Sequence, residues 1–231
     1  MKYIFILTLY FLGCTTANAQ YHPKDYFEFK DKKELVFFDD FNSDKTEWHM
    51  LPEDSDDTTN VCTINTDGIN YGNGIYYVYN NCKEEVGIEA AIEVDYTRNF
   101  EIILVAKVLY DDNDDTSVHN GYLEWNSNEQ TGKFNILFFS GFFNEFHTHL
   151  SFDSTKNNCE GLRKRLKPAR NTYNQFVRYT IRKYGDKYYV FVNGMLKGVF
   201  PYTKLNGSNI ALGARMDSKV EFDHLSIYYL P

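Results

Sequence analysis

Apolar and polar residues alternate along many short stretches of the chain, which is typical of strands with one buried face. Residues 86–94 alternate in this way, and residues 99–110 are almost continuously apolar, as in a strand buried on both faces. Further β-rich runs lie at 35–38, 75–82, 121–126, 134–139, 142–152, 177–182, 188–192, 195–200, 209–214 and 220–229. The pattern predicts about a dozen strands and no convincing amphipathic helix.

Turn residues separate these runs and set their pairing. Asn193-Gly194 is a strong hairpin signal because both turn positions need a positive φ, and Gly185-Asp186 predicts a second turn. The apolar positions of the last run change parity after Phe222, which predicts a bulge near Asp223-His224. The basic stretch 160–171 interrupts the β pattern and predicts a long loop. With no linker and no internal repeat, the chain predicts an all-β, two-sheet antiparallel sandwich in one domain.

The first nineteen residues have the pattern of a signal peptide. Lys2 precedes an apolar run over residues 3–12, and Ala17-Asn18-Ala19 places small residues where a signal peptidase cleaves. A buried core helix is the alternative, but it leaves the cationic start and the cleavage pattern unexplained. We therefore expect an exported protein, found in the periplasm, at the cell surface or outside the cell.

Leu12-Gly13-Cys14 is similar to a bacterial lipoprotein box, in which Cys14 would carry a lipid, although Phe11 stands where Leu is expected. Free export and lipid anchoring therefore both remain open. No later segment is long and apolar enough to predict a transmembrane helix. The expected organisation is a signal peptide over 1–19, a lead-in segment over 20–34 and the β-domain over 35–231.

Composition narrows the class of protein. Of the 231 residues, 43% are hydrophobic and 17% aromatic, with 19 Phe and 19 Tyr, which excludes a disordered chain. The formal net charge of -8 argues against a general nucleic-acid binder, because such a protein needs a cationic surface for phosphates.

Three cysteines follow the expected cleavage site: Cys62, Cys82 and Cys159. A hairpin centred on Gly72 would set residue 62 opposite residue 82, and export permits disulfides, so we expect a Cys62–Cys82 bridge. Two buried free thiols are the alternative. Cys159 is left over in a polar loop without the signature of a catalytic cysteine.

Several segments together resemble a known superfamily. They are FFDDFN at 37–42 with Trp48, NGYLEWN at 120–126, YNQF at 173–176, YTIRK at 179–183, YYVFVNG at 188–194 and VEFDHLSI at 220–227. This set is similar to the concanavalin A-like lectin/glucanase jelly roll, especially the version in secreted Bacteroidetes-type proteins that includes 3-keto-disaccharide hydrolase-like domains. The resemblance covers most of residues 35–230 and implies a jelly-roll sandwich. Its members include sugar-binding modules, glycosidases and domains of no known activity, so it does not decide the function.

The resemblance also indicates where catalytic carboxylates would lie. Retaining glucanases of the superfamily carry Glu-x-Asp-x-x-Glu on one strand, and the nearest match here starts at Glu93 and Asp95. Arg98 replaces the last carboxylate, and a cation cannot act as the general acid. Glu93 and Asp95 are therefore weak catalytic candidates, and a solvent-facing strand edge is the alternative.

Sugars bind to the concave sheet of family members by stacking on aromatic rings. Trp125 and Tyr122, with Glu124 on the same strand, are the ligand-binding candidates that follow from this resemblance. A core position is the alternative for Trp125, because it alternates with Leu123. Trp48 is expected to pack in the core.

Metal binding rests on weaker patterns. Asp111, Asp112 and Asp114 gather oxygen ligands that Ca²⁺ would bind, but the EF-hand spacing is absent and a solvated turn is the alternative. His147 and His149 share a strand face, yet the sequence supplies no third zinc ligand. No other cofactor is expected.

The sequence therefore predicts an exported or envelope-anchored, non-catalytic domain that binds a carbohydrate or a cell-envelope protein. A glycoside-cleaving enzyme and a structural envelope module are the alternatives. An enzyme requires a carboxylate pair in the concave groove, a lectin exposed aromatic rings there, and a structural module a filled groove.

Overall fold

The computed structural model describes part of the chain, almost all of it within the compact unit Glu34–Pro231. The described residues are 32–41, 48–51, 69–70, 75–80, 85–109, 119–142, 145–155, 164–166, 174–215 and 218–231. The predictions for the signal peptide, for Cys14, for the Cys62–Cys82 bridge and for Asp111, Asp112 and Asp114 lie outside these residues. None of the described segments is a helix of the length and apolar character that a membrane span requires.

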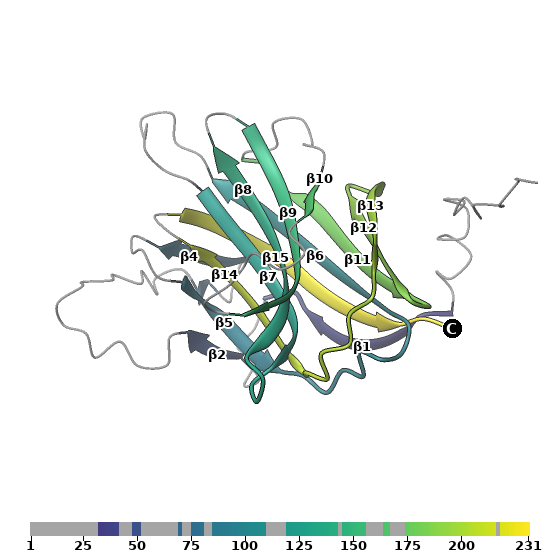
Figure 1. Ribbon diagram of the computed structural model, residues 1–231. Coiled ribbons are helices and arrows are strands. Elements are labelled where there is room, and N and C mark those ends of the chain that lie inside the picture. The colour runs from purple at the N-terminus through teal and green to yellow at the C-terminus, as the bar shows by residue number, and fades with distance from the viewer. Residues whose placement is uncertain are drawn as a thin grey trace, which may run out of the picture. The chain divides into compact units, whose positions relative to one another are not determined.

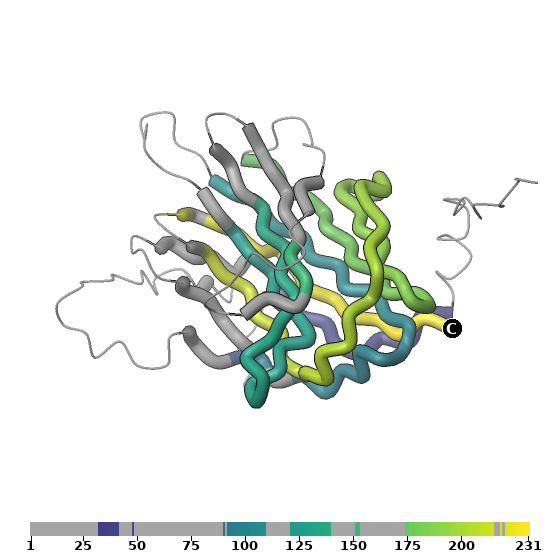
Figure 2. The backbone as a smooth tube through the Cα atoms, in the orientation of Figure 1, coloured from purple at the N-terminus to yellow at the C-terminus, as the bar shows by residue number. Residues whose placement is uncertain are grey.

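In the described part of the chain, the first sheet contains eight antiparallel strands (Figure 1). Its hydrogen-bonded order is β13 (Met195–Pro201), β12 (Lys187–Val192), β11 (Val177–Tyr184), β6 (Phe100–Leu109), β15 (Ser218–Tyr229), β4 (Ile75–Asn80) and β3 (Ile69–Asn70), with β1 (Glu34–Asp39) also paired to β15. In Figure 2 the C-terminal strand, coloured yellow, runs through the interior of this sheet. The long apolar run expected from the sequence is β6, which pairs with β11 and β15 and is buried along most of its length.

The second sheet contains seven antiparallel strands among the described residues and packs against the first. Its order is β10 (Lys164–Leu166), β9 (Glu145–Thr155), β8 (Lys133–Phe142), β7 (His119–Asn128), β14 (Asn209–Arg215), β5 (Glu85–Ala91) and β2 (Trp48–Leu51). The predicted fold class, a two-sheet antiparallel jelly-roll sandwich, is confirmed.

Aromatic rings from both inner faces fill the space between the sheets. Phe139 of β8 stacks on Tyr179 of β11 with ring centroids 4.8 Å apart, and Phe152 of β9 stacks on Tyr188 of β12 at 5.1 Å. Gly121 of β7 pairs with Phe139, whose ring occupies the space that a Cβ at Gly121 would need. The inner faces therefore form a densely packed aromatic core.

The predicted turns and bulge are confirmed. Asn193 and Gly194 have φ values of 50° and 75°, and Gly185 has 59°, as tight hairpin turns require. The pairing of β15 with β6 shifts register between Phe222 and His224, where the change of parity predicted a bulge.

Two details of the sequence prediction are wrong. The basic stretch 160–171 was expected to be a loop throughout, yet Lys164–Leu166 forms β10 at the edge of the second sheet. The β3–β4 hairpin pairs Ile69 with Tyr76, whereas a hairpin centred on Gly72 would pair Ile69 with Ile75, so the register is one residue away from the predicted one.

Trp48 packs in the core, as predicted. Its ring contacts Phe37 edge-on at 5.9 Å and Phe41 at 6.3 Å, and its side chain is 9% exposed. The indole nitrogen donates a hydrogen bond of 2.6 Å to Oδ2 of Asp39, which is itself buried. This bond satisfies the polar end of Trp48 at the start of the domain.

Candidate functional site

A second group of apolar side chains lies on the outer face of the second sheet, away from the inter-sheet core. We call this group the outer-face cluster: it consists of Tyr122, Phe134, Ile136 and Ala211, with the half-buried Phe138 packed against it. Their strand neighbours Leu123, Leu137 and Leu212 belong to the inter-sheet core. Since successive side chains point to opposite faces of a sheet, the cluster faces outward. Only the accessible side chains at such a cluster form a candidate binding surface.

Three strands present this cluster side by side. Glu124 of β7 is paired with Ala211 of β14 on one side and Ile136 of β8 on the other. One step along, Tyr122 is paired with Gly213 and Phe138. The half-buried Glu124 carboxylate therefore lies within an apolar surface, next to two aromatic residues.

The middle of this surface is filled. Tyr122 is 1% exposed, Phe134 3% and Ile136 0%, so their side chains do not form an open aromatic floor. The half-buried side chains Glu124 and Phe138 are the accessible part of the cluster and its surroundings.

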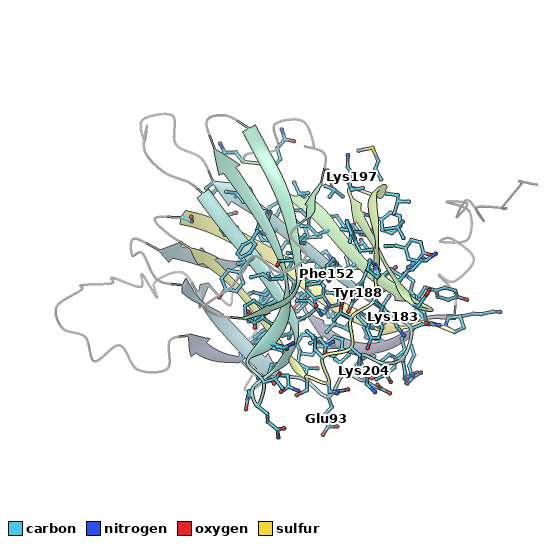
Figure 3. All side chains as sticks on the ribbon, viewed as in Figure 1. Glu93, Phe152, Lys183, Tyr188, Lys197 and Lys204 are labelled. Carbon is cyan, nitrogen blue, oxygen red and sulfur yellow. The ribbon has the colours of Figure 1, made fainter. Side chains whose placement is uncertain are left out.

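The structure removes Trp125 from the ligand-binding candidates. It points inward, is 0% exposed, and contacts the ring of Tyr188 edge-on at 6.0 Å. Figure 3 shows Phe152 and Tyr188, its neighbours, in the interior of the sandwich. Trp125 lies two positions after Leu123 on the same strand, so both side chains face the inter-sheet core. A ligand on the outer face therefore cannot reach Trp125. Tyr122 and Glu124 stay on the outer face.

The weak catalytic candidates Glu93 and Asp95 do not lie on a strand. They belong to the segment between β5 and β6, and Figure 3 shows Glu93 at the end of the sandwich, away from the middle of either sheet. Asp95 accepts hydrogen bonds from the backbone nitrogen of Thr97 at 3.0 Å and from its hydroxyl at 2.5 Å. These bonds lower the pKa of Asp95 and form a local turn. Glu93 and Asp95 therefore do not lie on one strand as the carboxylates of the glucanase motif do, because this segment forms a turn.

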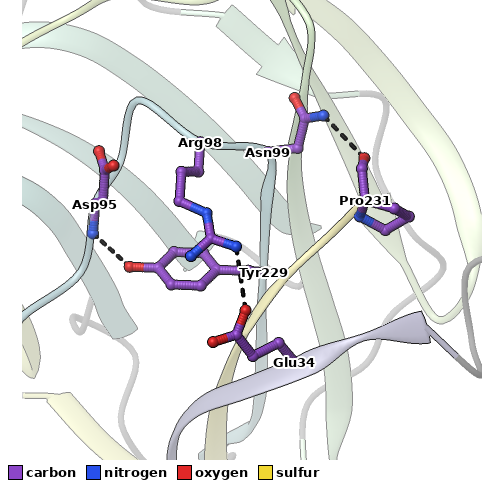
Figure 4. A network of polar contacts seen from close by, with 6 residues as sticks. All are labelled: Glu34, Asp95, Arg98, Asn99, Tyr229 and Pro231. Atoms are coloured by element: carbon purple, nitrogen blue, oxygen red, sulfur yellow. Dashed lines mark hydrogen bonds and ion pairs between the residues drawn. The ribbon is translucent and has the colours of Figure 1, made fainter.

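Arg98 in the same segment has a structural role (Figure 4). Its guanidinium lies 3.7 Å from the centre of the Tyr229 ring and forms an ion pair of 3.1 Å with Glu34. The Tyr229 hydroxyl accepts a hydrogen bond of 2.7 Å from the backbone nitrogen of Asp95. The residue that replaces the last carboxylate of the family motif thus ties this loop to β1 and β15.

Metal ligation gains no support among the residues that the structure describes, which contain no group of three or more His, Cys, Asp or Glu residues suited to a metal ion. His147 and His149 lie on β9, paired with Ser140 and Phe138 of β8.

Sequence reasoning missed Phe134, Ile136 and Phe138. The stretch FNILFF at 134–139 is apolar at almost every position, so it reads as a buried strand without showing which face meets the other sheet. The parity of Leu137 and Phe139, which face the core, would have placed the other three residues outside.

Comparison with known proteins agrees with this architecture. No protein-family model matches the sequence, and no curated protein matches it in sequence. Among solved structures, SCLam, a non-specific endo-beta-1,3(4)-glucanase from family GH16, superposes with a TM-score of 0.58 at 12% identity, covering 88% of this chain and 93% of that one. LamA from Z. galactanivorans, in complex with laminaritriose and laminaritetraose, gives 0.56 at 15% identity, with coverages of 87% and 99%. The Crh5 transglycosylase gives 0.54 at 11%, with 84% and 85%.

The chain has the concanavalin A-like lectin/glucanase jelly-roll fold. At these identities the likeness shows the fold and leaves the function to the residues of the site.

Proposed function

We propose that this protein is an exported, non-catalytic carbohydrate-binding or interaction domain whose ligand contacts the outer face of the second sheet. The observation that carries the proposal is the outer-face cluster with Glu124 beside it. Sugars offer apolar C–H faces to aromatic side chains and hydroxyl groups to carboxylates, and this surface provides both. Because Tyr122 and Ile136 are buried, the contacts are made by Phe138 and Glu124.

The charges on this face support binding without cleavage. Glycoside hydrolysis needs two carboxyl groups on either side of the scissile bond. Among the outward-facing side chains that the structure describes on β7, β8 and β14, Glu124 supplies the one carboxylate, and Glu93 and Asp95 lie at the end of the sandwich. The N-terminal signal pattern supports the exported location.

Glycoside cleavage is the second candidate, favoured by one feature of the register. Glu89 of β5 and Glu124 of β7 are both paired with Ala211 of β14, so a single strand separates their backbones. Neighbouring strands lie about 4.8 Å apart, which sets the two Cα atoms roughly 10 Å apart. This backbone separation is close to the distance of about 6.5–9.5 Å between the two carboxyl groups of inverting glycosidases.

A glycan array separates these candidates. We expect the purified protein to bind at least one glycan, with and without added Ca²⁺, and chromatography after prolonged incubation to show the glycan unchanged. Products that disappear in both Glu89→Gln and Glu124→Gln would establish the enzyme instead. The absence of binding to every glycan would contradict carbohydrate recognition and leave a protein-interaction module.

A further inference from the structure

The outer face of the second sheet continues beyond the outer-face cluster to the edge formed by β9 and β10 (Figure 1). His149 of β9 is paired with Phe138 of β8, and Arg165 of β10 is paired with His149. Residues paired in register on neighbouring strands belong to the same face of a sheet, and Phe138 packs against the outer-face cluster. Arg165, His149, Phe138 and Tyr122 therefore occupy one row across four adjacent strands of the outer face.

The positions between these residues agree with this assignment. Leu150, which follows His149, is paired with Leu137, and Leu137 lies in the inter-sheet core. Lys164 is paired with Leu150 and therefore has the inward parity. Of the two basic residues of β10, Arg165 is the one that lies in an outer row.

The carboxylates of β9 are distant from this basic end of the row. The outward positions next to His149 along the strand are His147 and Ser151. The first carboxylates on either side are Glu145 and Asp153, each four positions from His149. Because residues of one face follow one another every second position, neither of them adjoins the row.

The acidic positions of the same face lie on strands farther from β10. Glu124 is on β7, and Glu85 and Glu89 are on β5. Glu85 is paired with Arg215 of β14, so these two opposite charges share a row. The described part of the outer face is therefore acidic towards β5 and basic towards β10.

The spacing of the row suits a sugar unit that carries an acidic group. Neighbouring strands lie about 4.8 Å apart, so the Cα atoms of Phe138 and Arg165, two strands apart, are separated by roughly 10 Å. A pyranose packed on Phe138 would direct a substituent over β9, and an arginine side chain is long enough to meet it there. A guanidinium donates two parallel hydrogen bonds to a carboxylate or a similar oxyanion, and an imidazole N–H donates one.

We propose that the ligand of the outer face is an acidic carbohydrate, whose carboxylate or sulfate group binds at Arg165 and His149 while its sugar ring packs on Phe138. This inference rests on the proposed function, because it requires a carbohydrate on this face. It narrows that function to a chemical class, since a neutral glycan brings no anion to the guanidinium. Glu124 then accepts hydrogen bonds from hydroxyl groups on the side of the ligand away from its acidic group.

Pairs of oligosaccharides that differ only in the acidic group test this proposal. Isothermal titration compares an oligouronate with its carboxyl-reduced form, and a sulfated oligosaccharide with its desulfated form. We expect at least one acidic member to bind about tenfold more tightly than its neutral counterpart. The two pairs also show whether the anion is a carboxylate or a sulfate.

Arg165→Gln should weaken binding of the acidic member about tenfold and leave binding of its neutral counterpart unchanged. Arg178→Gln is the matched control, because it removes an exposed arginine from β11 of the first sheet, and it should change neither affinity. No loss in Arg165→Gln, or an equal loss in both arginine variants, would overturn the proposal.

The glycan array distinguishes this inference from the function on which it rests. If the protein binds neutral glycans as tightly as acidic ones, or neutral glycans alone, the acidic ligand is wrong and carbohydrate binding stands. If it binds no glycan of either kind, both are wrong.

Discussion

Single positions on β7 decide which chemistry the protein presents. Trp125 and Glu124 are neighbours in sequence, yet one side chain is sealed in the aromatic core and the other lies on the outer face. Asn126 then adopts a left-handed backbone conformation, which interrupts the alternation of the strand and turns the Asn126 side chain inward. Residue type alone therefore does not identify the ligand contacts; the face on which the strand places the residue does.

The hydrogen bond between Trp48 and Asp39 can be tested by a single substitution. Trp48→Phe keeps an aromatic ring beside Phe37 and Phe41 but removes the donor to the buried Asp39 carboxylate. A buried acceptor that loses its partner costs about 1–3 kcal/mol. We expect urea unfolding to show a loss of this size, while the exposed Lys204→Gln changes stability by less than about 0.5 kcal/mol. Equal effects of the two variants would contradict the role of this bond.

Asp95 gives a pH dependence with a defined sign. Its pKa is lowered in the folded protein by the bonds from Thr97, so it adds stability above the unfolded-state pKa of about 3.9, and this contribution is lost as the pH falls through the lower folded value. Because the carboxylate is exposed, the contribution stays below about 1 kcal/mol. Asp95→Asn should be slightly less stable than the native protein at pH 7, and the difference should shrink below pH 4 in thermal unfolding. A difference that grows in acid would have the wrong sign.

At the scale of elements, β7 depends on the segment before β14. The backbone of Gly207 lies so close to β7 that an added Cβ would come within 2.1 Å of the Ser127 carbonyl oxygen. The backbone must approach this closely for Gly207 to donate its hydrogen bond to Asn126. The bulge of β7 and this glycine are therefore one structural unit.

Gly207→Ala should consequently destabilise the fold by about 1–3 kcal/mol, the usual cost of overpacking. Gly132→Asn is the matched control: no heavy atom lies within 4 Å of its added Cβ, and Asn tolerates the left-handed φ of 63°. Denaturant midpoints measure both. A tolerated Gly207→Ala would show that the close approach is not needed.

The outer face of the first sheet carries a buried ion pair across β6 and β11. Arg182 is paired in register with Glu101, and its Nε donates to Oε2 of Glu101 at 2.6 Å; the residues are 3% and 1% exposed. Parity predicts the outward direction of Arg182, but no local pattern reveals that the charge is buried and paired with a residue more than eighty positions away.

Removing one partner leaves the other charge buried, so Glu101→Leu should cost about 3–5 kcal/mol. The double variant Glu101→Leu with Arg182→Met should recover most of this loss in the same urea titration. A double variant as unstable as the single one would show that neither charge depends on the other.

For the whole molecule, sequence predicted the parts that depend on local patterns. The strands, the turn at Asn193-Gly194 and the bulge after Phe222 follow from parity and from turn chemistry. The outer-face cluster does not, because an all-apolar stretch such as 134–139 has no visible parity until the opposite sheet is in place. The sequence also does not show that Glu89 and Glu124 lie in one row of the sheet. Both are paired with Ala211 of β14, a strand that comes much later in the chain.

Isothermal titration of the best glycan from the array tests most directly whether the outer face of the second sheet is the binding surface. We expect Glu124→Gln to weaken binding about tenfold or more, since a hydrogen bond to a charged group is worth about 1.5–3 kcal/mol. Phe138→Ala should weaken binding as well, because it removes the aromatic ring on which the sugar packs. Leu196→Ala, an exposed apolar change on the first sheet, should leave the affinity unchanged. Weaker binding in Leu196→Ala together with unchanged binding in both other variants would contradict the assignment.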